Sequence, residues 1–119
     1  MTAMTFSLRE APLQRIDLAA LTPDRLLGLS ESKIAATELQ TTRIRLCAGD
    51  LFKIRMGDAM KIRFEGGHER FDRVGASMTK GEINVAGDVG IQAGRLMQGG
   101  RLTIGGNAGP WAASGMRPR

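Results

Sequence analysis

A nineteen-residue repeat in the glycine-rich second half of the chain constrains its fold more than any other feature. When residues 75–93 are aligned with residues 94–112, six positions are identical. They are Gly75/Gly94, Met78/Met97, Gly81/Gly100, Gly87/Gly106, Gly90/Gly109 and Ala93/Ala112. An imperfect earlier copy aligns residues 62–66 with residues 83–87 at an offset of 21. Repeats of this length predict stacked units in which each copy covers its neighbour.

Apolar and polar residues alternate within each copy, as in a strand with one buried face. Ile83 and Val85 point one way, and Glu82 and Asn84 point the other. If the copies stack in parallel, equivalent residues lie about 4.8 Å apart and form ladders. The expected inward ladders are Ile83/Leu102, Val85/Ile104 and Met78/Met97/Met116, and the expected outward pair is Glu82/Arg101. This pattern predicts a mainly β fold, a right-handed parallel β-helix (solenoid) with coils of about 19 residues.

The glycines are expected to form the corners of these coils. Thirteen of the sixteen glycines lie in residues 61–119. Glycine at a corner tolerates a positive φ and leaves room for a neighbouring backbone. A flexible linker is a weaker interpretation, because apolar residues occupy matched ladder positions. The expected corner residues are Gly75, Gly81, Gly87, Gly90, Gly94, Gly100, Gly106 and Gly109.

The first sixty residues predict a small mixed α/β cap before the coils. Residues 5–8 alternate as a strand does, and Thr22-Pro23 begins a short helix that Gly28 ends. Residues 30–40 predict a second, weaker helix. From residue 43 the apolar period is two, which predicts short strands broken at residues 49–50, 57–58 and 66–67. We therefore divide the chain into a cap at 1–60 and Gly-rich coils at 61–119, which together form one structural unit that ends mid-repeat.

Composition and charge exclude several classes of protein. No apolar run reaches the roughly 18 residues of a membrane span, and the single cysteine, Cys47, excludes an internal disulfide. These features predict a cytoplasmic protein. The net charge is +5, and the excess lies after Asp88, where four arginines and no acid occur. No recognised nucleic-acid-binding motif accompanies these arginines, so we expect neither nucleic acid nor a membrane as a partner.

No constellation of catalytic residues is evident. His68 is the sole histidine, and although Glu69 and Asp72 are near it in sequence, no second ligand or nucleophile accompanies it. The glycines of residues 87–94 match neither a Walker loop nor a dinucleotide loop. We expect no catalytic, cofactor-binding or metal-binding residue, and no role is assigned to Cys47 or His68.

Residues 74–81, 85–90, 94–100 and 106–111 resemble the C subunit of formylmethanofuran dehydrogenase and the corresponding subunit of the bacterial formyltransferase/hydrolase complex. Similar glycine motifs occur in the GXGXG domain of the glutamate synthase large subunit. Residues 21–24 and 48–52 favour the C-subunit branch. Ala113 departs from the motif where a glycine is expected, and the family continues for several more coils. The chain is thus either a shortened relative or part of a longer subunit.

The resemblance implies a non-catalytic β-helical scaffold subunit of a one-carbon formyl-transfer complex. Its partners would be an amidohydrolase-like subunit and a formyltransferase subunit. A methanofuran-type formyl carrier, and in an archaeal complex a molybdenum or tungsten pterin with iron–sulfur clusters, would be bound by those partners. The alternative is a glutamate-synthase-like GXGXG interdomain or adaptor module outside one-carbon metabolism.

The C-terminal end of the repeat is the expected interface. A stack of strands that stops there leaves backbone groups unpaired, and apolar residues at that end would be ringed by arginines. We expect it to dock a partner subunit or a second copy of the chain. The candidate interface residues are Arg95, Met97, Arg101, Trp111, Met116 and Arg117.

Overall fold

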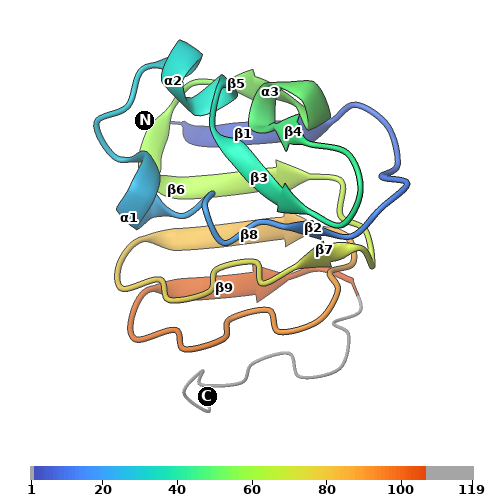
Figure 1. Cartoon of the computed structure of the whole chain (residues 1–119). Coiled ribbons are helices and arrows are strands. Elements are labelled where there is room, and N and C mark those ends of the chain that lie inside the picture. Colours follow the sequence, from blue (N-terminus) through green and yellow to red (C-terminus); the bar gives the residue numbers. More distant parts are fainter. Residues whose placement is uncertain (1, 107–119) are drawn as a thin grey trace.

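The computed structural model describes residues 2–106, which form two mixed β-sheets and three short helices (Figure 1). The five-stranded sheet has the order β5 (Phe52–Arg55), β1 (Ala3–Leu8), β6 (Asp58–Glu65), β8 (Glu82–Ala86) and β9 (Arg101–Ile104). The four-stranded sheet has the order β4 (Leu46–Cys47), β3 (Glu38–Thr41), β2 (Ile16–Asp17) and β7 (Phe71–Asp72). The helices are α1 (Pro23–Leu26), α2 (Glu31–Ala35) and α3 (Ala48–Leu51).

The expected fold class, a right-handed parallel β-helix, is wrong. The described residues form a small mixed α/β domain whose sheets contain antiparallel as well as parallel pairs. The physical reason lies in the first half of the chain. Residues 3–8 and 52–55 alternate in the same way as β6, so they extend the sheet beyond it, with β1 parallel and β5 antiparallel. The first half thus contributes strands to both sheets. The division at residue 60 stays a prediction.

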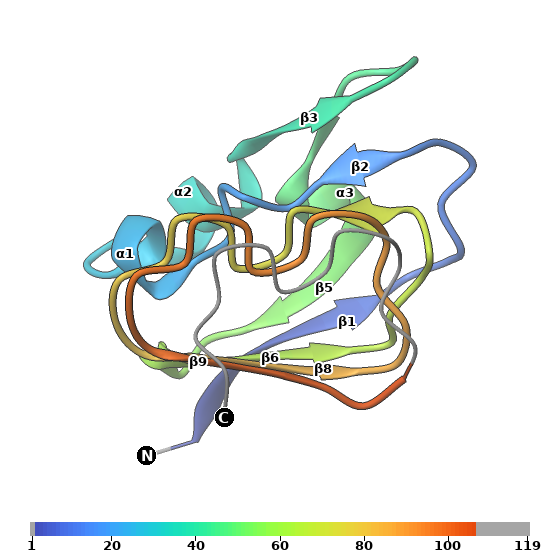
Figure 2. The same cartoon turned by 90° about the horizontal axis from the view of Figure 1, so that it is seen from below.

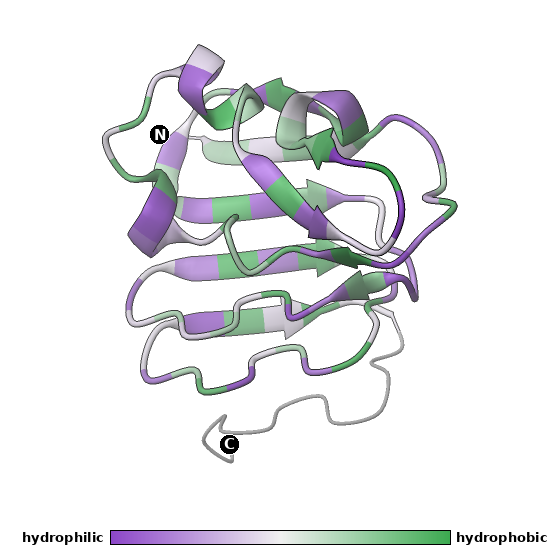
Figure 3. Ribbon diagram, in the orientation of Figure 1, coloured by the Kyte–Doolittle hydropathy of each residue, from purple (hydrophilic) through white to green (hydrophobic). Residues whose placement is uncertain are grey.

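Strand pairing nevertheless follows the sequence repeat. β8 pairs with β9 in parallel at an offset of 19, which places Ile83 opposite Leu102 and Val85 opposite Ile104. β6 pairs with β8 at an offset of 21, with Ile62 opposite Ile83. Both registers agree with the alignment. Figure 3 shows the resulting bands of apolar and polar residues along these strands.

The segments before β8 and β9 run side by side and have the same backbone shape (Figure 2). Each segment has two non-glycine residues in a left-handed conformation, at equivalent positions of the repeat. The first pair is Arg73 and Gln92, with φ of 57° and 59°, and the second is Ser77 and Leu96, with φ of 61° and 56°. Hydrogen bonds join the segments, including Arg73 N–H to the Ile91 carbonyl at 2.9 Å. The repeat therefore extends from the strands to their connections.

The predicted corner glycines serve two different purposes. A positive φ is found at Gly75, Gly81, Gly87, Gly94 and Gly100. Gly90 and Gly106 are not left-handed; a Cβ there would collide with neighbouring atoms, among them the carboxylates of Asp72 and Asp88 respectively. Gly109 lies outside the described residues.

The core lies between the two sheets and contains all four phenylalanines. Phe6 stacks on Phe64 with ring centroids 5.2 Å apart, and Phe52 lies 5.7 Å from Phe71 on the other sheet. All four rings are at most 1% exposed. Each such aromatic ring buries a large apolar surface, so this cluster joins the sheets. Met78 and Met97 are also buried, as predicted, whereas Met116 lies outside the described residues.

The helices of the first half agree only partly with the sequence pattern. α1 begins at Pro23 as expected, but α2 ends at Ala35, and residues 38–40 of the predicted helix belong to β3 instead. α3 spans residues 49–50, where a break between strands was expected. It forms because the Asp50 carboxylate accepts a hydrogen bond from the Cys47 N–H at 2.9 Å, which caps the helix N-terminus.

Candidate binding pocket

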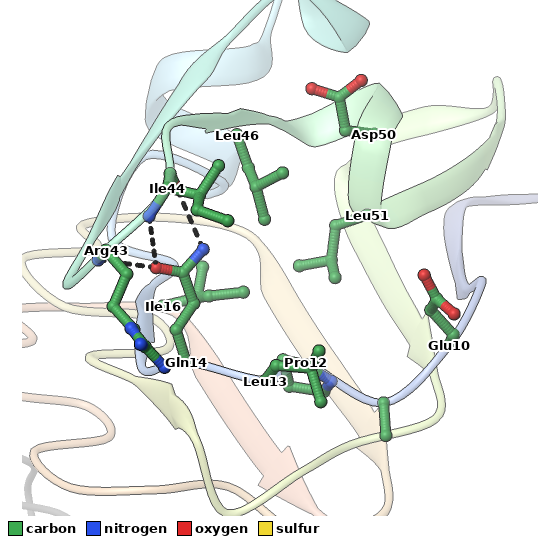
Figure 4. Close-up of a pocket in the computed structure, with 11 residues that line it drawn as sticks. Glu10, Pro12, Leu13, Gln14, Ile16, Arg43, Ile44, Leu46, Asp50 and Leu51 are labelled. Atoms are coloured by element: carbon green, nitrogen blue, oxygen red, sulfur yellow. Dashed lines mark hydrogen bonds between the residues drawn. The ribbon is translucent and has the colours of Figure 1, made fainter.

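The described residues form an apolar pocket of about 470 Å³ between two connections of the chain (Figure 4). One wall is the segment 10–14, between β1 and β2. The other is formed by residues 43–46 and by α3. The volume lies within the range of small-molecule pockets, roughly 300–1,000 Å³. The lining residues are Glu10, Ala11, Pro12, Leu13, Gln14, Ile16, Arg43, Ile44, Leu46, Asp50 and Leu51.

Gln14 holds the two walls together. Its side-chain oxygen accepts hydrogen bonds from the backbone N–H groups of Arg43 at 2.7 Å and Ile44 at 3.0 Å. Its amide nitrogen donates to the Ile44 carbonyl at 2.9 Å. Gln14 is only 9% exposed, so these bonds compensate for the burial of its polar side chain. The Gln14 side-chain amide thus makes the hydrogen bonds to the backbone of residues 43–44 that a neighbouring strand would otherwise make.

The floor of the pocket is buried, and two exposed apolar side chains stand at its mouth. Ile16 and Leu51 are buried within the core cluster, and Leu46 packs against it. Leu13 is 85% exposed and Ile44 is 69% exposed. Arg70 donates from its guanidinium to the Pro12 carbonyl at 3.0 Å, which anchors the backbone beside Leu13.

The predicted interface is only partly exposed. Arg95 and Arg101 are exposed, whereas Met97, which the repeat also places on an inward ladder, is 8% exposed and packs in the core. Its neighbour Leu96 is the exposed apolar residue in this segment, at 58%. Trp111, Met116 and Arg117 lie outside the described residues. The expectation that this end docks a partner stays a prediction.

His68 and Cys47 have local structural contacts. The His68 Nδ1 accepts a hydrogen bond from the Arg70 N–H at 3.1 Å. The Cys47 side chain takes part in the capping of α3. Within residues 2–106 no group of three His, Cys, Asp or Glu side chains is arranged to hold a metal ion. In the same residues no helix is long and apolar enough to cross a membrane.

Two carboxylates fix the connections beside β7 and β8. Asp72 accepts hydrogen bonds from Arg15 at 2.8 and 2.6 Å and from the Ile91 N–H at 3.0 Å. The Asp72 hydrogen bond raises the pKa of Arg15 above its ordinary value, although partial burial acts in the opposite direction. Asp24 at the start of α1 accepts hydrogen bonds from the Thr79 hydroxyl and from the Thr79 N–H at 3.1 Å. Burial raises the pKa of Asp24, but these hydrogen bonds outweigh it, so the pKa is lowered overall.

The chain is related in sequence to a curated protein, the C subunit of the formyltransferase/hydrolase complex Fhc of Methylorubrum extorquens. The two are 42% identical over 86 residues, which cover 72% of this chain and 32% of the relative. The chain thus spans about a third of that protein's length. No protein-family model matches the chain.

The fold is also similar to a solved structure. One polypeptide in the crystal structure of the formyltransferase/hydrolase complex FhcABCD from Methylorubrum extorquens, in complex with methylofuran, matches with a TM-score of 0.88 and 43% identity. The match covers 93% of this chain and 42% of that polypeptide. The resemblance to the C subunit noted in the sequence is therefore confirmed. The β-helix and the GXGXG motif that accompanied it are not supported.

Proposed function

We propose that this chain, being a relative of the C subunit of the formyltransferase/hydrolase complex, is a non-catalytic subunit of a complex of that kind. The observation that carries the proposal is the match to a polypeptide of the FhcABCD complex at a TM-score of 0.88 and 43% identity. At this identity the sequence and the fold agree, so the likeness is more than a shared architecture. The role proposed is that of a scaffold in one-carbon metabolism.

The proposed partners are an amidohydrolase-like subunit and a formyltransferase subunit. A methanofuran-type formyl carrier would be bound by these partners and not by this chain. The docking surface proposed from the sequence is the C-terminal end of the repeat, and of its candidate residues within 2–106, Arg95 and Arg101 are exposed. The partner surface that meets these arginines would be acidic. A cytoplasmic location stays a prediction.

Purification of the tagged chain from its own host, with identification of bound proteins by mass spectrometry, tests this function. The amidohydrolase-like and formyltransferase subunits are expected in the eluate. Their absence, with recovery of a glutaminase or flavoprotein synthase instead, would favour the glutamate-synthase-like adaptor alternative. Charge reversal by Arg95→Glu with Arg101→Glu is expected to weaken the complex, whereas Arg25→Glu with Lys33→Glu on the helices serves as the control.

A further inference from the structure

The mouth of the pocket holds the two most exposed large apolar side chains of the described residues, Leu13 and Ile44. They come from two different connections, are thirty-one residues apart in the sequence, and line the same cavity. Single exposed apolar residues are common on protein surfaces, but two that gather around an apolar cavity are typical of an interaction site. The pocket therefore requires an explanation beyond the fold.

The exposed residues are held in place and not left to move with loose loops. Gln14 makes three hydrogen bonds to the 43–44 backbone, and the Thr41 hydroxyl donates to the Ile44 carbonyl at 2.8 Å. On the other wall Arg70 is bonded to the Pro12 carbonyl. A site that is fixed before binding loses less conformational entropy when a partner arrives. This preorganisation favours binding of a matching apolar group.

Charge at the mouth indicates what lies next to that apolar group. Glu10 and Asp50 line one side of the pocket and Arg43 lines the other (Figure 4). Within residues 2–106 neither carboxylate has an ion pair, although Asp50 accepts the capping hydrogen bond from Cys47. The chain as a whole is basic, with a net charge of +5, but this side of the pocket is acidic. A basic group on the occupant would therefore pair with Glu10 or Asp50.

We propose that the pocket binds one or two large apolar side chains of a partner subunit, next to a lysine or arginine that pairs with Glu10. The inference rests on the proposed function, since it requires that partner subunits exist. A free small molecule is disfavoured because the buried polar atoms of Gln14 are already bonded to backbone and cannot orient it. Leu13 and Ile44 instead extend the apolar surface outward around the cavity, as at the centre of a protein interface.

The test compares two pairs of substitutions in the full chain, co-expressed with the other subunits. Leu13→Asp with Ile44→Asp places two negative charges at the mouth of the pocket. It is expected to raise the dissociation constant of the complex by about 100-fold or more, the range expected when two interface hot spots are lost. Leu27→Asp with Met56→Asp is the matched control, because these residues are also exposed, at 50% and 37%, but do not line the pocket. Glu10→Lys is expected to weaken assembly by a smaller factor.

Each outcome of the experiment separates the possibilities. Equal assembly of the pocket variant and the control, with both folded by circular dichroism, would overturn the inference while leaving the proposed function intact. Failure of the wild-type chain to bind any subunit would overturn the proposed function, and the inference with it. A wild-type homodimer that Leu13→Asp with Ile44→Asp converts to a monomer would show that the occupant is a second copy, and would also overturn the inference.

Discussion

The Asp72 carboxylate lies directly against the backbone of Gly90, in the space that a side chain at position 90 would occupy. A Cβ on Gly90 would collide with the Asp72 Oδ1 and with the Glu69 carbonyl oxygen. The same Oδ1 accepts hydrogen bonds from Arg15 and from the Ile91 N–H. Gly90 thus allows the backbone before Ile91 to approach a carboxylate that joins three segments of the chain.

Gly90→Ala is accordingly expected to destabilise the chain by roughly 1–3 kcal/mol, the cost of forcing an extra group into a packed site. Gly28→Ala is the control, because Gly28 has a φ of 86° and nothing within 4 Å of an added Cβ. That change introduces backbone strain without a collision and is expected to cost about 1 kcal/mol. Urea unfolding of both variants measures the difference. A smaller loss for Gly90→Ala than for Gly28→Ala would show that the site relaxes easily.

The inward face of β8 supplies a second prediction. Val85 is 4% exposed and lies opposite Phe64 and Ile104, whereas Asn84 is on the other face. Val85→Asp would bury an unpaired carboxylate, so we expect a loss of several kcal/mol, roughly the 3–5 kcal/mol of an uncompensated buried charge. Asn84→Asp is expected to change stability by at most about 0.5 kcal/mol, as at ordinary surface sites. Equal melting temperatures for the two variants would contradict the assignment of the faces.

Acid is expected to weaken the contact between α1 and the segment before β8. The pKa of Asp24 is lowered from its ordinary value of 3.8, so the folded state prefers the ionised carboxylate. Its contribution is therefore present above pH 3.8 and is lost as the pH falls through the lowered pKa. Asp24→Ala removes the hydrogen bonds to Thr79 at every pH. The difference in stability between wild type and this variant, measured by urea unfolding from pH 7 to pH 2, should narrow at the acid end. A difference that stays constant over this range would refute the linkage.

The repeat predicts strand register well because it records direct neighbours. Ile83 and Leu102 occupy equivalent positions in the sequence alignment and pair in the sheet. The same periodicity gives no information about β1 and β5, which join this sheet although no copy of the repeat contains them. Their placement depends on packing of Phe6 and Phe52 against Phe64, contacts between segments far apart in sequence. The predicted fold class, a parallel β-helix, was wrong because the repeat contains no information about these two strands.

The pocket had no signal in the sequence that periodicity could detect. Gln14 and Ile44 are thirty residues apart, and a buried glutamine that bonds to the backbone of another connection looks like any polar loop residue. Leu13 was equally uninformative, since an isolated leucine in a connection predicts neither burial nor exposure. Gln14 is buried, and the reason for its burial is visible only in the folded structure, where the two connections lie against each other.

The outer face of the five-stranded sheet carries a row of alternating charge, which leads to the last prediction. Lys61 lies opposite Glu82, and Glu82 lies opposite Arg101. Glu82→Lys would place three cations side by side, and like charges directly opposite one another destabilise a sheet by up to about 1 kcal/mol per pair. Glu10→Lys makes the same change in net charge in a connection, so it is the control.

Stability is to be measured in low salt and in about 1 M salt, where the screening length falls to about 3 Å. We expect Glu82→Lys to be less stable than Glu10→Lys in low salt, and the gap to shrink in high salt because the repulsion is screened. A gap that salt does not change would mean that the loss comes from packing of the longer side chain and not from the charge row. No ion pair within 4 Å involves Glu82 in residues 2–106, so the effect tests the register itself and not a single contact.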